Sequence, residues 1–221
     1  MITKHKFKYN TIGYFRGNAH EIVMATFGKK HDPIGAKAYV EPEGQINRRY
    51  LNGHVKMGTI ADINWSRENR ADVEVNGNFN IYGVNGQVNA SGDLRDADSV
   101  DAKLAYFYIY PNQVENILNN EARVARTFLA DEGKDGRVVT GIWVVLEATL
   151  ASEFEAKGST SLSASALGQN LSITVGGGTK SAQSITVSPG STFAYSLHKV
   201  KKWNRGKTRV EDLEDDKKGM G

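Results

Sequence analysis

Residues 138–146 form an almost uninterrupted apolar run, VVTGIWVVL, and no other stretch constrains the fold as much. A strand with one face in water would alternate polar and apolar residues. The run therefore predicts a strand that is buried on both faces. A second strand that anchors the same region is expected over residues 185–200, with a turn at Ser188, Pro189 and Gly190.

The segment between these two strands has a period of two. From residue 149 onward, apolar residues fall at every second position and polar residues, mostly serine, lie between them. Such alternation is typical of strands with one apolar and one solvated face. The apolar face of this ribbon, residues 149–175, is predicted to hold Leu150, Phe154, Leu162, Leu171, Ile173 and Val175.

A similar two-faced ribbon lies earlier in the chain, over residues 72–101. Its apolar positions alternate with acidic, amide and glycine positions, as in the stretch DVEVNGNFNIYG. We therefore expect a second pair of strand arms here. Its apolar face is predicted to hold Val73, Val75, Phe79 and Ile81.

The remaining elements are predicted from apolar spacing and from turn residues. Shorter strands are expected over 21–27, 36–40, 55–65 and 104–110, and a helix over 113–130. A length of 221 residues fits one sizeable domain.

No catalytic pattern is present in the sequence. Cysteine is absent, and the five histidines show no metal-ligand spacing. The stretch GGGTKS at 176–181 does not have the spacing of a phosphate-binding loop. We therefore expect no enzyme, no metal and no cofactor. The N-terminus lacks the apolar segment of a signal peptide, which leads us to expect a cytoplasmic protein in its inactive state.

Charge is distributed unevenly along the chain. Residues 1–60 hold ten Lys and Arg against four Asp and Glu, residues 61–185 hold ten against sixteen, and residues 186–221 hold eight against five. The acidic middle argues against a nucleic-acid partner. Two basic ends fit an anionic lipid surface, or simply a solvated face. The predicted lipid-binding residues are Lys4, Lys6, Lys8, Phe27, Lys29, Lys30, Ile34, Lys199, Lys201 and Lys202.

The two ribbons allow two interpretations. They fit half-buried strands of an ordinary antiparallel sheet. They also fit membrane-spanning hairpins, because about 9–11 tilted residues cross a bilayer and a closed barrel satisfies their backbone groups.

Three blocks of sequence resemble the pore-forming domain of the gasdermin family. They are KLAYFYIYPNQVENIL at 103–118, VVTGIWVVLEATL at 138–150 and SITVSPGSTFAYSLHKV at 184–200. Their order and spacing, with one polar ribbon before the first block and another between the second and third, cover roughly residues 72–203. Residues 1–71 are similar only in outline.

The resemblance implies an α+β fold, with a twisted antiparallel sheet, flanking helices and two amphipathic ribbons. Family members of this kind refold the ribbons into transmembrane β-hairpins, and the subunits close into a large β-barrel pore on anionic membranes during regulated cell death. The partners implied are an anionic membrane and further copies of the same or a related subunit, and the assembled pore would lie in the cell membrane.

The resemblance also predicts a pore-forming domain at 1–203 and a polar tail at 204–221. The tail has few large apolar residues, so we expect it to be mainly solvated and its removal to leave activity unchanged. This favours the short fungal type, called regulators of cell death, over the prokaryotic type. The alternative is a β-rich, lectin-like binding module without pore activity.

Overall fold

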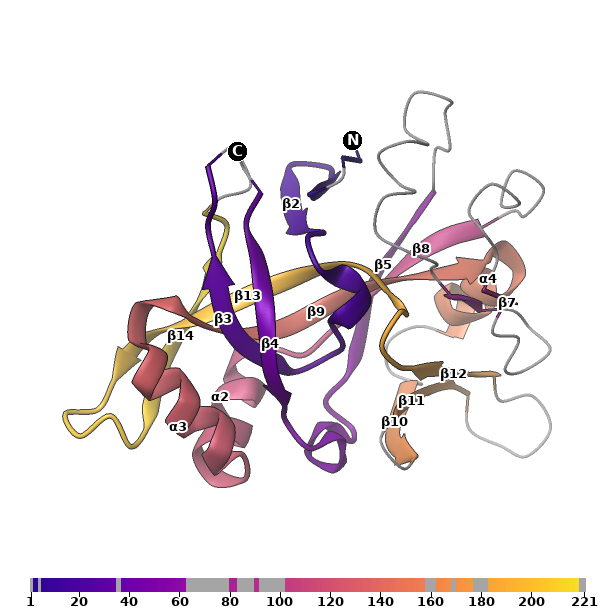
Figure 1. Ribbon diagram of the computed structural model, residues 1–221. Helices are drawn as coiled ribbons and strands as arrows, with labels where there is room; N and C mark the ends of the chain where they lie inside the picture. Colours follow the sequence, from indigo (N-terminus) through magenta and orange to yellow (C-terminus); the bar gives the residue numbers. More distant parts are fainter. Residues whose placement is uncertain are drawn as a thin grey trace.

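The computed structural model describes residues 2–3, 5–34, 37–62, 80–82, 90–91, 102–157, 162–167, 170–176 and 183–218. Strands that are mostly antiparallel form the body of the molecule, and helices α2, α3 and α4 pack against them (Figure 1). The predicted α+β class is confirmed in this form.

Four long strands make the centre of the fold. They are β5 (Lys56–Asp62), β8 (Ala102–Tyr108), β9 (Gly136–Glu147) and β13 (Thr192–Trp203), and each is antiparallel to the next in this order. Eleven of the twelve residues of β9 are buried. The apolar run therefore forms the buried strand that the sequence predicts.

Strand β9 has two different partners along each edge. One edge pairs first with β3 (Thr26–His31) and then with β8. The other edge pairs with β13 and then, at its last residues, with the short β6 (Asn80–Tyr82). The sheet is branched at β9 as a result.

Each face of the sheet has its own core. On one face, the hairpin of β1 (Lys6–Tyr9) and β2 (Ile12–Phe15) covers an aromatic cluster, in which the ring of Trp143 lies 5.1 Å from Phe7 and 5.3 Å from Tyr14. On the other face, Ile142, Val144 and Leu146 belong to the main core, which includes the helices. The alternation of these residues along β9 explains why the whole run is apolar.

The predicted helix over 113–130 is two helices, α2 (Pro111–Asn120) and α3 (Arg123–Glu132). The chain turns between them, and the guanidinium of Arg126 donates hydrogen bonds to the free carbonyl oxygens of Leu118 and Asn119. Helix ends leave such carbonyls without a partner, so Arg126 stabilises the break. Val124, an apolar residue in the first turn of α3, is 77% exposed.

Residues 148–157 correct another prediction. They form helix α4 (Ala148–Lys157) instead of the first arm of a ribbon. Leu150 and Phe154 are four residues apart, so both face the core in a helix as well. Residues Ala, Leu, Glu and Lys are also good helix formers. The rest of the segment is a separate antiparallel sheet of β10 (Leu162–Leu167), β11 (Asn170–Val175) and β12 (Gln183–Val187).

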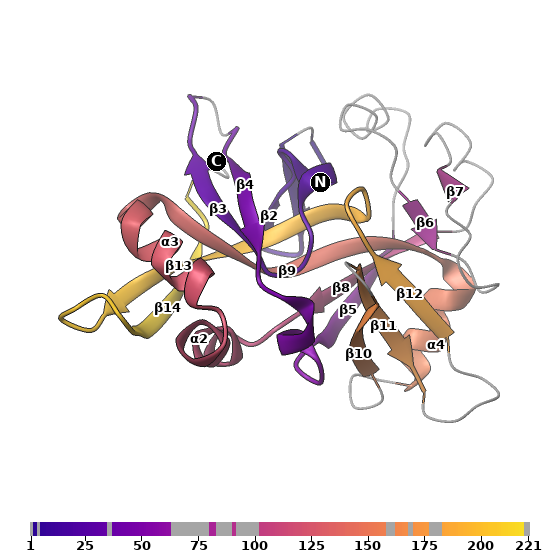
Figure 2. The ribbon, with the colours of Figure 1, turned by 60° about the horizontal axis from the view of Figure 1, so that its bottom comes forward.

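The tail is also different from the expectation of a solvated segment. Strand β14 (Val210–Asp216) pairs antiparallel with β13, and its residues Val210, Leu213 and Asp216 are buried. The remaining elements are β4 (Tyr39–Gln45), which pairs with β3, the two-residue β7 (Ala90–Ser91), and the 3-10 turns η1 (Ala19–Glu21), η2 (Arg48–Leu51) and η4 (Gly133–Asp135). Hairpins β1–β2 and β3–β4 rise on the same side of the molecule (Figures 1 and 2).

Candidate functional site

The four central strands end together, and both long connections of the chain leave from that end. We call residues 63–101 the first insert, residues 148–191 the second insert, and this end of the sheet the insert end. It lies at the right of Figure 1, whereas α2 and α3 lie at the left. The strand pairs that mark it are Asp62 with Lys103, Ala102 with Glu147, and Thr192 with Val144.

Both inserts are long compared with a transmembrane strand. The first has 39 residues and the second has 44. One strand needs about 9–11 residues to cross a bilayer, so a hairpin needs about 20 and a turn. Each insert is therefore long enough to continue two neighbouring central strands as a hairpin.

The apolar face of the second insert is hidden inside the protein. Leu171, Ile173 and Val175 are fully buried on β11, and the ring of Phe154 on α4 meets that of Phe107 at 5.7 Å. All of these residues belong to the main core. Leu150 is also fully buried, and Leu162 packs partly exposed against the same core.

The first insert contacts the edge of β9 that β13 leaves open. Ile81 of β6 is the register partner of Val145, one residue beyond the point at which β13 ends its pairing. The hydroxyl of Tyr82 donates a hydrogen bond of 2.7 Å to the carbonyl oxygen of Thr186 in the second insert. The two inserts are thus in contact. Val73, Val75 and Phe79 lie outside the described residues, as does the side chain of Ile81.

The cations predicted on β13 have acidic partners on β14. Each of these lysines forms an ion pair of 2.8 to 2.9 Å with the strand that follows it in the chain. The pairs are Lys199 with Glu214, Lys201 with Asp212, and Lys202 with Glu211. Their charge is therefore largely neutralised in this state.

Residues 27–34, which hold four of the predicted lipid-binding residues, are mostly a strand. Phe27 is buried on β3 against the ring of Phe128, and Lys30 is also buried, which contradicts the prediction that both contact lipid from the surface of this form. The sequence looks like a loop because of Gly28, but here the glycine lets the backbone of Glu41 approach closely. Ile34, near the tip of the hairpin, is 99% exposed.

The other predicted lipid-binding cations are scattered. Lys29 is half exposed and forms an ion pair of 3.3 Å with Glu132. Lys6 and Lys8 lie on β1, in the hairpin that covers the aromatic cluster. Lys4 lies outside the described residues. The predicted cations among the described residues therefore lie on three different strands, β1, β3 and β13.

A buried ion cluster that the sequence analysis missed joins three distant segments. The carboxylate of Asp216 accepts hydrogen bonds from Lys30 Nζ at 2.7 Å and from Arg137 Nε at 2.6 Å, and all three side chains are buried. Burial acts to raise the pKa of Asp216, but the hydrogen bonds from Lys30 and Arg137 outweigh it, so the pKa lies below its usual value.

Next to this cluster, a chain of polar side chains crosses β8, β9, β13 and β14. Asp215 Oδ1 lies 2.9 Å from His198 Nε2, and His198 Nδ1 lies 2.7 Å from Thr140 Oγ1. Thr140 Oγ1 lies 3.3 Å from Ser196 Oγ, which is 3.0 Å from Tyr106 Oη. The pKa of His198 is lowered, because burial outweighs the opposing effect of Asp215. This chain satisfies polar atoms that would otherwise be buried without partners.

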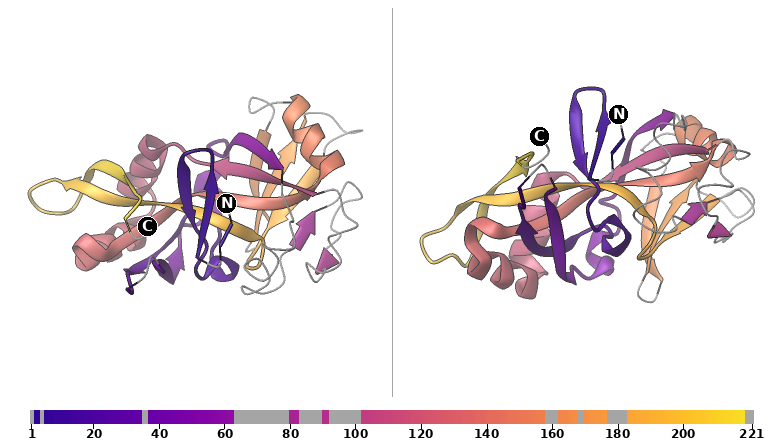
Figure 3. Two further views of the ribbon diagram at one scale, coloured as in Figure 1. Left: turned by 90° about the horizontal axis from the view of Figure 1, so that it is seen from above. Right: turned by 45° about the horizontal axis from the view of Figure 1, so that its top comes forward.

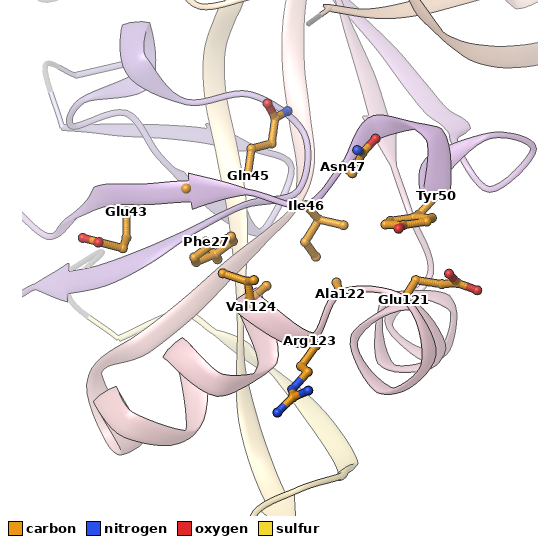
Figure 4. A pocket seen from close by; sticks show the side chains of 12 residues that line it. Phe27, Glu43, Gln45, Ile46, Asn47, Tyr50, Glu121, Ala122, Arg123 and Val124 are labelled. Atoms are coloured by element: carbon orange, nitrogen blue, oxygen red, sulfur yellow. The ribbon is translucent and has the colours of Figure 1, made fainter.

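A pocket of about 490 Å³ lies at the other end of the molecule, between the end of β4, η2 and the start of α3 (Figure 4). Phe27, Ile46 and Ala122 contribute its apolar surface, and Glu43 and Arg123 also line it. Its lining has no histidine or serine. Within the described ranges, no group of three or more His, Asp or Glu side chains is placed to hold a metal ion.

No helix in the part of the chain that the structure describes is long and apolar enough to cross a membrane. The resemblance to gasdermins stays a prediction, which rests on the three sequence blocks at 103–118, 138–150 and 184–200. No protein-family model, curated protein or solved structure matches the chain.

Proposed function

We propose that this chain is a membrane pore-forming protein whose two inserts refold into transmembrane hairpins. The observation that carries the proposal is the arrangement of the central strands. Strands β5, β8, β9 and β13 are consecutive neighbours in one antiparallel sheet, and both inserts leave from the same end of it.

With this arrangement, the inserts can refold without a change in the order of the central strands. The first insert joins β5 to β8 and the second joins β9 to β13, so each insert links two neighbouring antiparallel strands. If each insert extends the two strands it joins, the four strands continue as one sheet without crossing. Such a sheet still has two edges, and edges are not tolerated in lipid, so several subunits have to close a barrel.

The packing of the second insert supports a two-state protein. Its apolar side chains are buried against the core, and the same side chains would face lipid after refolding. Two packings of one sequence that differ by only about a few kcal/mol are known in switching proteins. We propose an inactive cytoplasmic form and an assembled form in the cell membrane, with an anionic lipid surface and copies of the same or a related subunit as partners.

A matched pair of substitutions on β10 tests the proposal. Ala166 and Ser165 are both exposed in the folded protein, so an arginine at either position leaves the fold intact. In the extended hairpin, Ala166 shares the lipid-facing side with Leu162, and Ser165 faces the pore. An arginine facing lipid costs about 2–4 kcal/mol at the bilayer midplane.

We expect Ala166→Arg to lower dye release from phosphatidylserine-containing vesicles by about tenfold or more, whereas Ser165→Arg stays close to the unsubstituted chain. Both variants add one positive charge, so they bind the vesicles equally well. Equal dye release by both would contradict the assignment of the faces. Intact vesicles with the unsubstituted chain, alone and with a related subunit, would favour the alternative of a β-rich binding module.

A further inference from the structure

A buried arginine lies where the second insert meets the body of the molecule. Arg48 belongs to η2, which packs beside the small sheet of β10, β11 and β12 (Figures 1 and 3). Only 7% of Arg48 is exposed, although its guanidinium stays charged at neutral pH. The next residue, Arg49, is exposed and stacks on the ring of Tyr50 at 4.6 Å. The turn therefore buries one of two neighbouring arginines and leaves the other in water.

The guanidinium of Arg48 has few partners. Within the described ranges, no Asp or Glu side chain forms an ion pair with it, and its Nε is buried without a hydrogen-bond acceptor. Its Nη1 donates one hydrogen bond to Asn170 Oδ1 at 3.4 Å, which is longer than usual. Burial lowers the pKa of Arg48, and no carboxylate in the described part of the chain opposes this effect.

Two buried cations at the other end of the sheet are compensated, in contrast to Arg48. Lys30 and Arg137 both donate hydrogen bonds to the carboxylate of Asp216. A buried charge without an opposite charge is costly, because neither water nor a carboxylate replaces the hydration that it loses. The packed position of the second insert therefore carries a cost, which is removed when the insert leaves and water reaches Arg48.

The residue that meets Arg48 is at the midpoint of the second insert. Asn170 has 22 residues of the insert before it and 21 after it. In the folded protein it begins β11 and is the register partner of Leu167, where β10 and β11 are joined. In the extended hairpin, the midpoint becomes the tip, which is the point farthest from the central sheet. The contact between Arg48 and Asn170 therefore belongs to the packed form alone.

We infer that Arg48 is a release element, whose uncompensated buried charge makes the packed position of the second insert less stable and so allows the insert to leave. A two-state equilibrium shifts with any interaction that differs between its states. Arg48 is such a difference, since it is desolvated in one state and open to water in the other. The inference rests on the proposed function for its biological role, but the opening of the insert can be measured without a membrane.

The substitution Asn170→Asp tests this role, because it places a carboxylate of the same size opposite the guanidinium. We expect amide hydrogen exchange in β10, β11 and β12 to become about tenfold slower, while β9 and β13 are unchanged. Asn112→Asp, which adds the same charge on the exposed first turn of α2, is the matched control and should leave β10–β12 as they are. Unchanged exchange in Asn170→Asp, or equal changes in both variants, would overturn the inference.

Arg48→Met distinguishes a destabilising charge from a stabilising contact. The substitution keeps an apolar side chain at this position and removes the charge. We expect exchange in β10–β12 to become about threefold slower, because no unpaired charge is buried. Exchange as fast as in the unsubstituted chain, or faster, would mean that Arg48 holds the insert in place and would overturn the inference.

The double variant R48M/N170D shows whether the two side chains act on each other. Its carboxylate has no guanidinium opposite it, so exchange in β10–β12 should be faster than in Asn170→Asp alone. Equally slow exchange in the double variant and in Asn170→Asp would show that the carboxylate acts without Arg48, and would reject the assigned role.

Dye release separates this inference from the proposed pore. With phosphatidylserine-containing vesicles, Asn170→Asp should release less dye than the unsubstituted chain, because the packed form is favoured. If exchange slows in this variant but the unsubstituted chain releases no dye, alone or with a related subunit, the role of Arg48 is supported and the pore is rejected. If the unsubstituted chain releases dye but exchange in the variant does not slow, the pore is supported and the role of Arg48 is rejected.

Discussion

The two ends of the central sheet are held together by different kinds of contact. At the end that carries α2, α3 and β14, directional polar contacts are added to the apolar packing of the helices. Asp216 binds Lys30 and Arg137, Asn119 binds the backbone of Val210, and Arg126 binds the last carbonyl oxygens of α2. Such contacts need one geometry, because a buried polar group without its partner is costly.

At the insert end, the described side chains of the second insert are held mainly by apolar packing. Phe154 packs on Phe107, and Leu171, Ile173 and Val175 are buried on β11. Apolar burial is non-directional, so the same side chains can exchange a protein environment for lipid. One end of the sheet is therefore a fixed frame, and we call it the fixed end. The other, the insert end, is a part that can exchange a protein environment for lipid.

The largest expected effect is a loss of stability at the fixed end when residues 204–221 are removed. Without β14, the edge of β13 is exposed and Lys30 and Arg137 lose the carboxylate that compensates their buried charge. We expect a loss of stability greater than that of any single substitution in β14, measured by urea unfolding. The expectation of a mainly solvated tail is wrong for residues 210–216, whereas the expectation that removal of the tail leaves activity unchanged stays a prediction. Removal of residues 219–221 alone is the control, and unchanged stability after the longer removal would contradict the assigned role of β14.

The substitution Asp216→Ala isolates the ion cluster from the rest of β14. Removing one partner of a buried ion pair typically costs about 3–5 kcal/mol, because the remaining charges are uncompensated. We expect a loss of this size in the free energy of unfolding near neutral pH. Glu211→Ala, which removes an exposed partner on the same strand, should change little. The comparison of the two ends would be wrong if both variants unfold alike.

At the insert end, Phe154→Ala should lower the free energy of unfolding by about 3 kcal/mol, because a buried aromatic ring is lost and a cavity is left behind. The effect should also be local. Amide hydrogen exchange should increase in α4 and β10–β12 while β13 and β14 stay protected, and dye release should rise because the inactive packing is weakened. Increased exchange throughout the central sheet would mean that the insert is not an independent part.

The central strand and the turn before β13 could be predicted from the sequence, because each has a local cause. A continuous apolar run has few alternatives to a buried strand, and Ser188, Pro189 and Gly190 mark a turn. The sequence pattern predicts a strand where α4 forms, because the spacing of Leu150 and Phe154 fits both the helical period and the strand period. Local pattern does not decide between them, and packing on Phe107 does.

The ion cluster and the paired tail could not be predicted in this way. Lys30 and Asp216 are 186 residues apart, and nothing local to either residue indicates its partner. Five acids within seven residues are typical of a solvated segment when the strand opposite is unknown. Once β14 is placed beside β13, the same acids become the reason for the pairing.

The smallest expected effect is a dependence of the fixed end on pH. His198 lies between Asp215 and Thr140, and burial lowers its pKa below the usual value of 6.5. The unfolded chain therefore binds a proton at a pH at which the folded chain does not. The resulting stability is fully present above the usual pKa and decreases as the pH falls through it toward the folded value. Asp216 contributes a second loss of stability only at lower pH, below its usual pKa of 3.8, because its pKa in the folded protein is also lowered.

We therefore expect the free energy of unfolding to fall between about pH 7.5 and about pH 5.5, and His198→Gln to reduce that fall. His20→Gln, a change at an exposed histidine outside the ion cluster, is the matched control and should keep the full dependence. Because the described packing of α4 is mainly apolar, the protection of its amides against hydrogen exchange, relative to the intrinsic rate at each pH, should stay constant over the same range. If the loss on acidification appears first in α4, the fixed frame and the exchangeable part have been assigned to the wrong ends.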